Sequence, residues 1–242
     1  MSAMVIILAR AGSKGVPGKN VALVADRPCI EWTLDHALAT AGDPEIVVST
    51  DCPVAAELGR LRGATVVQRP SELAHDRATI DDAARHALAE VSGRAGGTRQ
   101  ELVVILYANV PVRPASLIDR ALDVLRTTGC DSVQSYQPVG KHHPWWTARL
   151  DPASASVDPW EGEVLNHNVF RRQDLPPAFI PDGGVIALTA RALRLEVPKV
   201  TPGPHAFFGR DRRGVINPEG SVVDIDSPID LIVADAILRG RA

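Results

Sequence analysis

Short apolar runs rich in β-branched residues alternate along this chain with segments of helical length and pattern. The expected strands are Met4–Leu8, Glu45–Ser49, Ala64–Gln68, Leu102–Leu106 and Ser132–Ser135. The expected helices between them are Ile30–Ala41, Val54–Arg62, Ile80–Val91 and Pro114–Thr127. Buried parallel strands form such continuous apolar runs because helices cover both faces of their sheet. The alternation therefore predicts an α/β domain with a mainly parallel, helix-flanked sheet up to about Ser135.

The segment Pro114–Thr127 has the clearest helical pattern. Its apolar residues recur at helical spacing, Pro114 suits the first turn of a helix, and Gly129 suits the position just past its end. The apolar residues are Leu117, Ile118, Ala121, Leu122 and Leu125.

The stretch Gln137–Pro181 has a different composition, with crowded prolines, histidines and three of the four tryptophans, Trp145, Trp146 and Trp160. It lacks sustained periodicity, which favours an inserted arm over another strand and helix. Strands are expected again at Gly183–Leu188 and Ser221–Ile225, followed by a helix at Pro228–Leu238. The prediction is one domain formed by residues 1–136 and 182–242, with an arm at 137–181.

Composition limits the possible partners of the chain. Its 242 residues are 45% hydrophobic and 23% charged, as in soluble globular proteins, and 26 Lys and Arg against 29 Asp and Glu give a net charge of −3. No global positive field favours nucleic acid or an anionic membrane, and no apolar run approaches the length of a membrane span or a signal peptide. Three widely spaced cysteines fit a reducing compartment. We therefore expect a cytoplasmic protein.

The loop after the first expected strand, ARAGSKGVPGKN at residues 9–20, is rich in glycine and cations. Glycines let backbone N–H groups face a polyanion, and Arg10, Lys14 and Lys19 add charged donors. Ligands of open α/β sheets bind at this end of the strands. The spacing matches neither the dinucleotide fingerprint nor the ATPase loop, and a solvated basic turn is the structural alternative.

Two aspartates in VVDIDSP, Asp224 and Asp226, alternate along the expected strand, which would place both carboxylates on one face. Magnesium prefers one or two carboxylates together with substrate phosphates and water, so the pair is a candidate metal site. Asp226 is alternatively the N-cap of the following helix, and Asp224 a loop cap. Asp230 is expected to be an exposed carboxylate in the first helical turn.

Six blocks of sequence closely resemble the acylneuraminate cytidylyltransferases, which make CMP-sialic acid from CTP and a nonulosonic acid. They are ILARAGSKGVPGKN, IVVSTD, QRPSELAHDRAT, HHP, RRQDLPPAF and DIDSPID, in family order across nearly the whole chain. The resemblance implies a Rossmann-like nucleotidyltransferase fold, magnesium dependence, a small dimerisation arm and a homodimer.

Residue by residue, the resemblance implies that Arg10, Lys14 and Lys19 hold the triphosphate and that Asn20 and Arg69 contact the nucleoside. Asp224 and Asp226 match its metal ligands, and Asp51 matches a motif position without a clear role. Arg10, Lys19 and Asp226 are the expected catalytic residues. The remaining expected contacts to CTP are Ala9, Gly12, Ser13, Lys14, Gly15, Asn20 and Arg69, and those to the acceptor are Tyr107, His142, His143, Arg172, Gln173 and Asp182.

Departures from the family pattern fall on the acceptor side. Tyr107 replaces a glutamine, Asp182 an asparagine, Ile186 a tyrosine, and Trp146 a lysine of some relatives. Asp182 would bring negative charge to the acceptor pocket, and Trp146 a stacking surface in place of a cation. Two alternatives remain open: an acceptor other than N-acetylneuraminate, or a pocket that the substitutions repack around the same sugar.

The expected activity is transfer of CMP from magnesium-bound CTP to the hydroxyl of an acidic acceptor, a nonulosonic acid, with release of pyrophosphate. The proton of that hydroxyl would pass to a metal-bound hydroxide or to a carboxylate such as Asp226. The alternatives are another acidic acceptor, either an eight-carbon sugar acid or a phosphonate, and a non-catalytic homologue that binds nucleotide.

Overall fold

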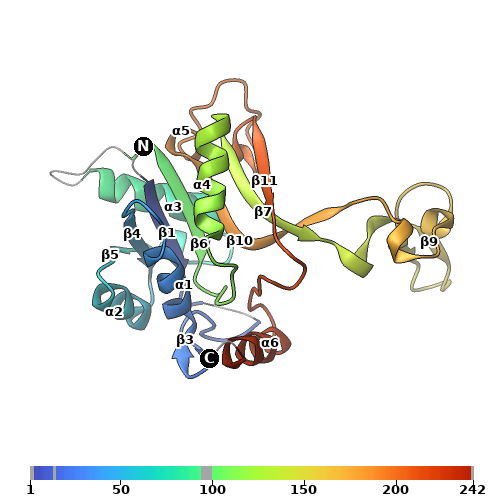
Figure 1. Cartoon of the computed structure of the whole chain (residues 1–242), viewed down its shortest axis with the longest axis horizontal. Helices are drawn as coiled ribbons and strands as arrows, with labels where there is room; N and C mark the ends of the chain where they lie inside the picture. Colours follow the sequence, from blue (N-terminus) through green and yellow to red (C-terminus); the bar gives the residue numbers. More distant parts are fainter. Residues whose placement is uncertain (1–2, 13–14, 94–99, 241–242) are drawn as a thin grey trace.

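The computed structural model describes residues 3–12, 15–93 and 100–240. A seven-stranded sheet, in the order β11-β7-β10-β6-β1-β4-β5, forms the centre of the molecule (Figure 1). Strands β1 (Ala3–Ala9), β4 (Glu45–Thr50), β5 (Thr65–Gln68) and β6 (Leu102–Tyr107) are mutually parallel. The long strand β10 (Phe179–Thr189) lies antiparallel between β6 and β7 (Ser132–Pro138), and β11 (Arg212–Ile216) forms the edge, parallel to β7.

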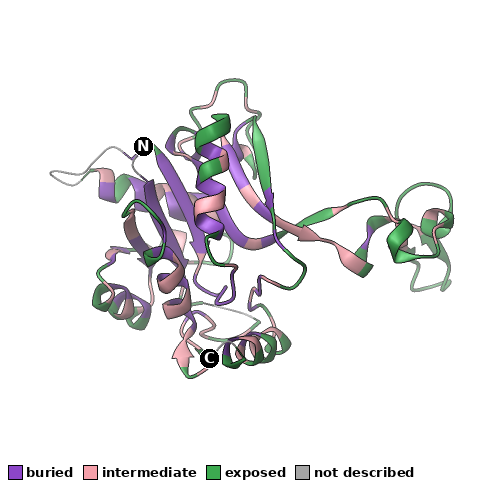
Figure 2. Ribbon diagram, in the orientation of Figure 1, coloured by how far each residue is buried: buried purple, intermediate pink, exposed green. Residues whose placement is uncertain are grey.

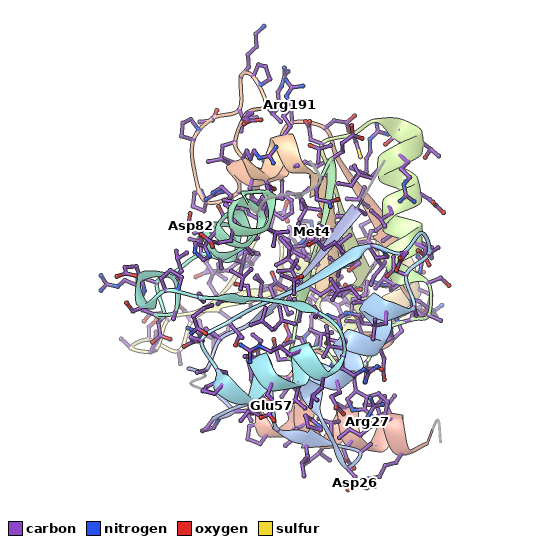
Figure 3. The ribbon with its side chains drawn as sticks, turned by 90° about the vertical axis from the view of Figure 1, so that its left-hand side faces the viewer. Met4, Asp26, Arg27, Glu57, Asp82 and Arg191 are labelled. Atoms are coloured by element: carbon purple, nitrogen blue, oxygen red, sulfur yellow. The ribbon has the colours of Figure 1, made fainter. Side chains whose placement is uncertain are left out.

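Helices cover both faces of this sheet because the side chains of each buried strand alternate between the two faces. Val5 and Ile7 of β1 pack with α1 (Cys29–Leu38), α2 (Pro53–Leu61) and α4 (Leu117–Thr128). Met4 and Ile6 pack on the other face with α3 (Ile80–Ser92) and α5 (Ala190–Leu193). The interior of this three-layer body is buried (Figure 2), and Met4 lies at its centre while Asp26 and Glu57 lie at its surface (Figure 3).

A third apolar cluster lies beside the sheet. Helix α6 (Pro228–Arg239) packs Ala234 and Leu238 against Val24 of the short β2–β3 hairpin (Leu23–Val24 and Arg27–Pro28). Val112, Val223 and Ile225 complete the cluster. This packing holds the segment before α6 next to the loop that follows β6.

Strands β7 and β10 extend beyond the body, and residues 139–178 between them project away from it (Figure 1). This projection carries a hairpin of β8 (Ala148–Leu150) and β9 (Val157–Pro159). Its short 3-10 helices are η2 (Gly140–His142), η3 (Pro144–Trp146), η4 (Leu165–Asn168) and η5 (Arg172–Asp174). None of its apolar side chains is buried. Two further 3-10 helices, η1 (Ser71–Leu73) and η6 (Ala206–Phe208), lie in the body.

The α/β class and the mainly parallel sheet are confirmed, and the five expected strands of the first half are all present. The strand expected at Ser221–Ile225 is wrong, because this segment makes only one isolated bridge, between Val223 and Val112. The edge strand is instead Arg212–Ile216. Pro114 precedes α4 rather than lying in its first turn, whereas Gly129 ends α4 with a φ of 66° in the left-handed region.

Among the described residues, no helix is both long enough and apolar enough to cross a bilayer.

Candidate active site

The carboxyl ends of four parallel strands meet at one edge of the sheet and bring charged and amide side chains together. Arg10 follows β1, Arg69 follows β5, and Asn109 lies just after β6. The strand registers make these ends adjacent, because Leu8 pairs with Tyr107, Ala9 with Thr50, and Thr50 with Gln68.

A cavity of about 220 Å³ lies at these strand ends. Its polar walls contain both described cations of the loop, Arg10 and Lys19, together with Arg69. Its other lining residues are Leu8, Asn20, Leu73, His75, Asp76, Ala78, Thr79, Ile80, Tyr107 and Asn109. Four of the residues that the resemblance assigns to triphosphate and nucleoside, Arg10, Lys19, Asn20 and Arg69, thus line one cavity where open α/β sheets bind ligands.

The loop of residues 9–20 is held by a hydrogen bond to the end of β4 and by one within the loop itself. Asp51, at the end of β4, accepts a hydrogen bond of 2.7 Å from the backbone N–H of Ala11. Asn20 Nδ2 donates to the carbonyl of Arg10 over 2.8 Å. The Asp51 side chain therefore holds the loop by accepting a hydrogen bond from the loop's backbone. Ser13 and Lys14, both expected contacts to CTP, lie outside the described residues, while Ala9 is buried and Gly12 has open space around its Cα.

Gly15 lies against the segment that carries the aspartate pair. A Cβ at this position would stand 2.1 Å from the backbone carbonyl oxygen of Asp226, well inside van der Waals contact. A glycine is required here because the loop and residues 224–226 approach so closely. The same approach lets Lys19 Nζ pair with Asp226 Oδ1 at 2.5 Å.

Arg69 is only 6% exposed and has no carboxylate in direct contact among the described residues. Its Nη2 donates to the carbonyl of Ser49 over 2.9 Å and its Nε to the Ser49 hydroxyl over 3.3 Å. Burial lowers the pKa of the Arg69 guanidinium. Asn20 is also buried, and its Oδ1 has no hydrogen-bond partner in the part of the chain that the structure describes. A ligand that donates a hydrogen bond would satisfy this acceptor.

Asp224 and Asp226 are not on a strand, but they remain neighbours next to the cavity. Asn109 Nδ2 donates to Asp224 Oδ1, and burial together with the charge of Asp226 raises the pKa of Asp224 to about 6. Asp226 is not an N-cap, because Ser227 occupies that position and Asp230 completes its capping box. Asp230 thus accepts from Ser227 rather than being a free surface carboxylate.

The carboxylate pair fits a magnesium ion that is also held by phosphates. Among the described residues, no three or more His, Cys, Asp and Glu side chains gather as a complete metal site. Two carboxylates that repel each other gain from a shared cation, and Mg²⁺ commonly takes only one or two carboxylates when phosphates and water fill its other positions. Asp224 and Asp226 are therefore the residues that would hold it.

Of the four departures on the expected acceptor side, Tyr107 alone lines the cavity. Burial and the nearby charge of Asp224 raise the pKa of the Tyr107 phenol to about 12. Ile186 is buried in the core on the face of α3. Asp182 does not line this cavity: it is 8% exposed, and Ser135 Oγ, the Gly184 N–H and Asn217 Nδ2 donate to its carboxylate.

The other expected acceptor residues lie on the projection, outside this cavity. His143 is buried there and uses both ring nitrogens locally, with the Trp145 N–H and the Pro176 carbonyl. Trp146 Nε1 donates to the carbonyl of Val169 over 2.9 Å. Arg172 pairs with Glu219 at 2.5 Å, and His142 and Gln173 are exposed. Within one chain, these residues do not join the residues around Arg10.

Sequence reasoning missed Arg113, a fully buried cation beneath the site. Its guanidinium donates to the carbonyls of Tyr107, Val110 and Gly184 and to the Thr33 hydroxyl, and burial lowers its pKa to about 10. Arg113 therefore fixes the turn that carries Tyr107 and Asn109 into the cavity. Asn109 was missed as well, although its place after an expected strand was a usable indication.

Comparison with known proteins shows the fold and the family of this chain. The fold is that of a Rossmann-like nucleotidyltransferase: the solved structure of CMP:2-keto-3-deoxy-manno-octonic acid synthetase complexed with CTP matches at a TM-score of 0.72 and 16% identity, over 100% of both chains. A family model described as cytidylyltransferase matches residues 4–151, and the chain belongs to that family.

Curated relatives share its sequence more closely. The chain is 34% identical over 76% of its length to an N-acylneuraminate cytidylyltransferase of Streptococcus agalactiae, of which it spans 43%. It is 27% identical to the CMP-N,N'-diacetyllegionaminic acid synthase of Legionella pneumophila, over 99% of this chain and 97% of that protein.

Proposed function

We propose that the protein transfers CMP from magnesium-bound CTP to the hydroxyl of an acidic sugar, a nonulosonic acid, and releases pyrophosphate. The observation that carries this proposal is the convergence of Arg10, Lys19 and Arg69 on one cavity beside Asp224 and Asp226. Phosphoryl transfer requires mainly positioning and neutralisation of charge on the phosphate oxygens, which such a set of groups supplies.

We assign a role in this reaction to each of these groups. Arg10 and Lys19 bind the β- and γ-phosphates, which leave as pyrophosphate when the acceptor oxygen attacks the α-phosphorus. Asn20, with its unpartnered buried Oδ1, and Arg69 bind the nucleoside. Asp224 and Asp226 would hold magnesium, which supplies further neutralisation of phosphate charge. Asp226, whose side chain is 72% exposed, is the carboxylate to which we assign the proton of the attacking hydroxyl.

The acceptor is assigned to the nonulosonic acids because relatives named for N-acylneuraminate and for N,N'-diacetyllegionaminic acid are similar to this chain. Tyr107 gives the cavity an aromatic wall where relatives carry an amide, which supports an acceptor with fewer polar groups than N-acetylneuraminate. An eight-carbon sugar acid is the second candidate, on the strength of the fold neighbour.

We further propose that the protein forms a homodimer. The projection of residues 139–178 exposes Phe170 at 88% and Trp160 at 55%, and exposed apolar surface of this kind is typical of interfaces. Arg172 and Gln173 lie on this projection and are not among the residues that line the cavity of their own protomer. We therefore assign them to the acceptor site of a second copy, which the projection would close.

Pyrophosphate release from CTP, with N-acetylneuraminate, N,N'-diacetyllegionaminate or 2-keto-3-deoxy-manno-octonate as acceptor, tests the proposal. We expect release that depends on both magnesium and one nonulosonic acid, with N-acetylneuraminate a poor substrate. Release with the octonate alone would replace the acceptor assignment. CTP binding without release for any acidic acceptor would favour a non-catalytic homologue.

A further inference from the structure

One wall of the cavity is formed by the segment between β5 and α3. Leu73, His75, Asp76 and Thr79 line the cavity from this segment. Its backbone hydrogen bonds are local, from Leu73 to Pro70, from Ala74 to Ser71 and from Ala78 to His75. The segment thus forms its own small turns and presents side chains to the loop of residues 9–20.

Asp76, on this wall, contacts the loop of residues 9–20. Its Oδ1 accepts a hydrogen bond of 2.9 Å from Arg10 Nη1, and the two side chains are 45% and 35% exposed. Lys19 is paired in the same way with Asp226. Each described cation of the loop is therefore paired with a carboxylate of this chain.

The pairing has an electrostatic reason. Arg10 lies close enough to Arg69 for its charge to contribute to lowering the pKa of Arg69, after the larger effect of burial. Gathered cations repel one another when no anion is bound, and a carboxylate at the rim offsets that repulsion. A bound triphosphate would also offset the repulsion among these cations, but the phosphate oxygens would then lie next to the negative charge of Asp76.

We propose that Asp76 is an exchange partner for Arg10: it holds the guanidinium when the pocket is empty, yields it to the triphosphate, and takes it back when pyrophosphate leaves. This inference rests on the proposed function in assigning phosphates to Arg10. Ion pairs that are partly exposed are weak, so a polyphosphate displaces the Asp76 carboxylate readily. Asp76 is thus a positioning residue that acts through Arg10 and lowers the affinity for polyphosphate.

The test measures binding of inorganic pyrophosphate and tripolyphosphate without metal, by calorimetry in the presence of a chelator. Asp76→Asn removes the competing charge and keeps the shape, so we expect both anions to bind about twofold to fivefold more tightly. Glu72→Gln removes a carboxylate from the exposed η1 turn of the same segment and is the matched control, with a change below about 1.5-fold expected because solvent and salt screen it.

A double-mutant cycle with Arg10→Met identifies the route of the effect. In the Arg10→Met background, Asp76→Asn should give a clearly smaller gain in anion affinity than in the unaltered protein, because the competition for Arg10 is lost and only direct repulsion by the Asp76 charge remains. A merely structural role for Asp76 would weaken binding when the residue is replaced, whereas exchange strengthens it. Asp76→Ser serves as a second variant if Asp76→Asn fails to fold.

Weaker or unchanged anion binding in Asp76→Asn, or an equal gain without Arg10, would overturn the proposal. So would the absence of measurable anion binding in every variant. Failure of the proposed function has a different result: no acidic acceptor supports pyrophosphate release from CTP, while the cycle with inorganic anions retains its expected pattern.

Discussion

Lys19 joins the loop of residues 9–20 to the aspartate pair. Its ammonium lies 2.5 Å from Asp226 at the edge of the cavity. Lys19→Ala should weaken CTP binding about tenfold to a hundredfold, because a charge-assisted hydrogen bond to phosphate is lost.

Calorimetry with CTP, together with thermal unfolding, checks this prediction. Lys199→Ala, which removes an exposed lysine far along the chain, is the control and should leave CTP affinity unchanged. CTP affinity equal to that of the unaltered protein would remove Lys19 from the phosphate site.

The ionised Asp224 carboxylate should destabilise the folded protein when no cation is bound. Its pKa is raised from 3.8 to about 6 by burial and by Asp226, so the folded protein holds this proton more tightly than the unfolded chain does. The stabilisation by protonation is complete below about pH 4 and is lost as the pH rises through about 6. Asp224→Asn should therefore raise the free energy of unfolding at pH 8 by on the order of 2 kcal/mol without metal, and should abolish turnover.

Urea unfolding of the metal-free protein at pH 5 and pH 8 measures this effect. The gain should shrink at the lower pH, and the matched change Asp226→Asn should give little gain because that side chain is 72% exposed. A less stable Asp224→Asn protein at pH 8 would contradict the proposed cost of this buried charge.

Asp182 should act on stability rather than on choice of acceptor. Ser135, Gly184 and Asn217 donate to its two carboxylate oxygens. In Asp182→Asn one of these oxygens becomes an NH₂ group that faces a donor, so we expect a loss of about 1 to 3 kcal/mol in the free energy of unfolding. Acceptor preference, measured as a ratio of kcat/KM values, should not change. A shift towards N-acetylneuraminate would return Asp182 to the acceptor pocket.

Residues of the site differ in how far the sequence predicted them. Arg10 and Arg69 follow strand ends in a recognisable order, and together with Lys19 they line one cavity. Asp182 and Ile186 do not line this cavity, and a motif aligned in sequence does not state whether a side chain faces a pocket or the core. The buried position of Arg113 could not be predicted, since a buried arginine that donates to carbonyls has no sequence pattern of its own.

Elements were predicted well wherever burial produces a continuous apolar run. The edge strand Arg212–Ile216 was missed because it is mostly exposed and contains two arginines and a glycine. Ser221–Ile225 resembled a strand because Val222, Val223 and Ile225 are buried. Val223 and Ile225 pack in the cluster beneath α6, and Val222 packs with the residues of α4, without pairing in the sheet. Apolar composition reports burial, and strand pairing is decided by neighbours far along the chain.

At the scale of the whole molecule, the projection predicts a homodimer. Phe170 is 88% exposed, and it lies on the projection of residues 139–178, where no apolar side chain is buried. Phe170→Ser should shift the protein towards monomer, measured by light scattering at micromolar concentration. Leu61→Ser, at a side chain 75% exposed on α2, is the control and should leave the association unchanged.

Loss of association in Phe170→Ser should be accompanied by a loss of transfer activity, since the acceptor site is assigned to two protomers. CTP binding should persist, because the residues around Arg10 come from one chain. A monomeric unaltered protein with full activity would contradict the assignment of the projection to a second copy.

The central claim is that CTP binds at the carboxyl ends of β1, β5 and β6. A crystal structure of the protein with CTP and magnesium tests it most directly. The account predicts phosphate oxygens within hydrogen-bond distance of Arg10 and Lys19, the nucleoside against Asn20 and Arg69, and the metal at Asp224 and Asp226. Nucleotide bound elsewhere, such as in the cavity lined by His36 and Ser116 between α1 and α4, would contradict it.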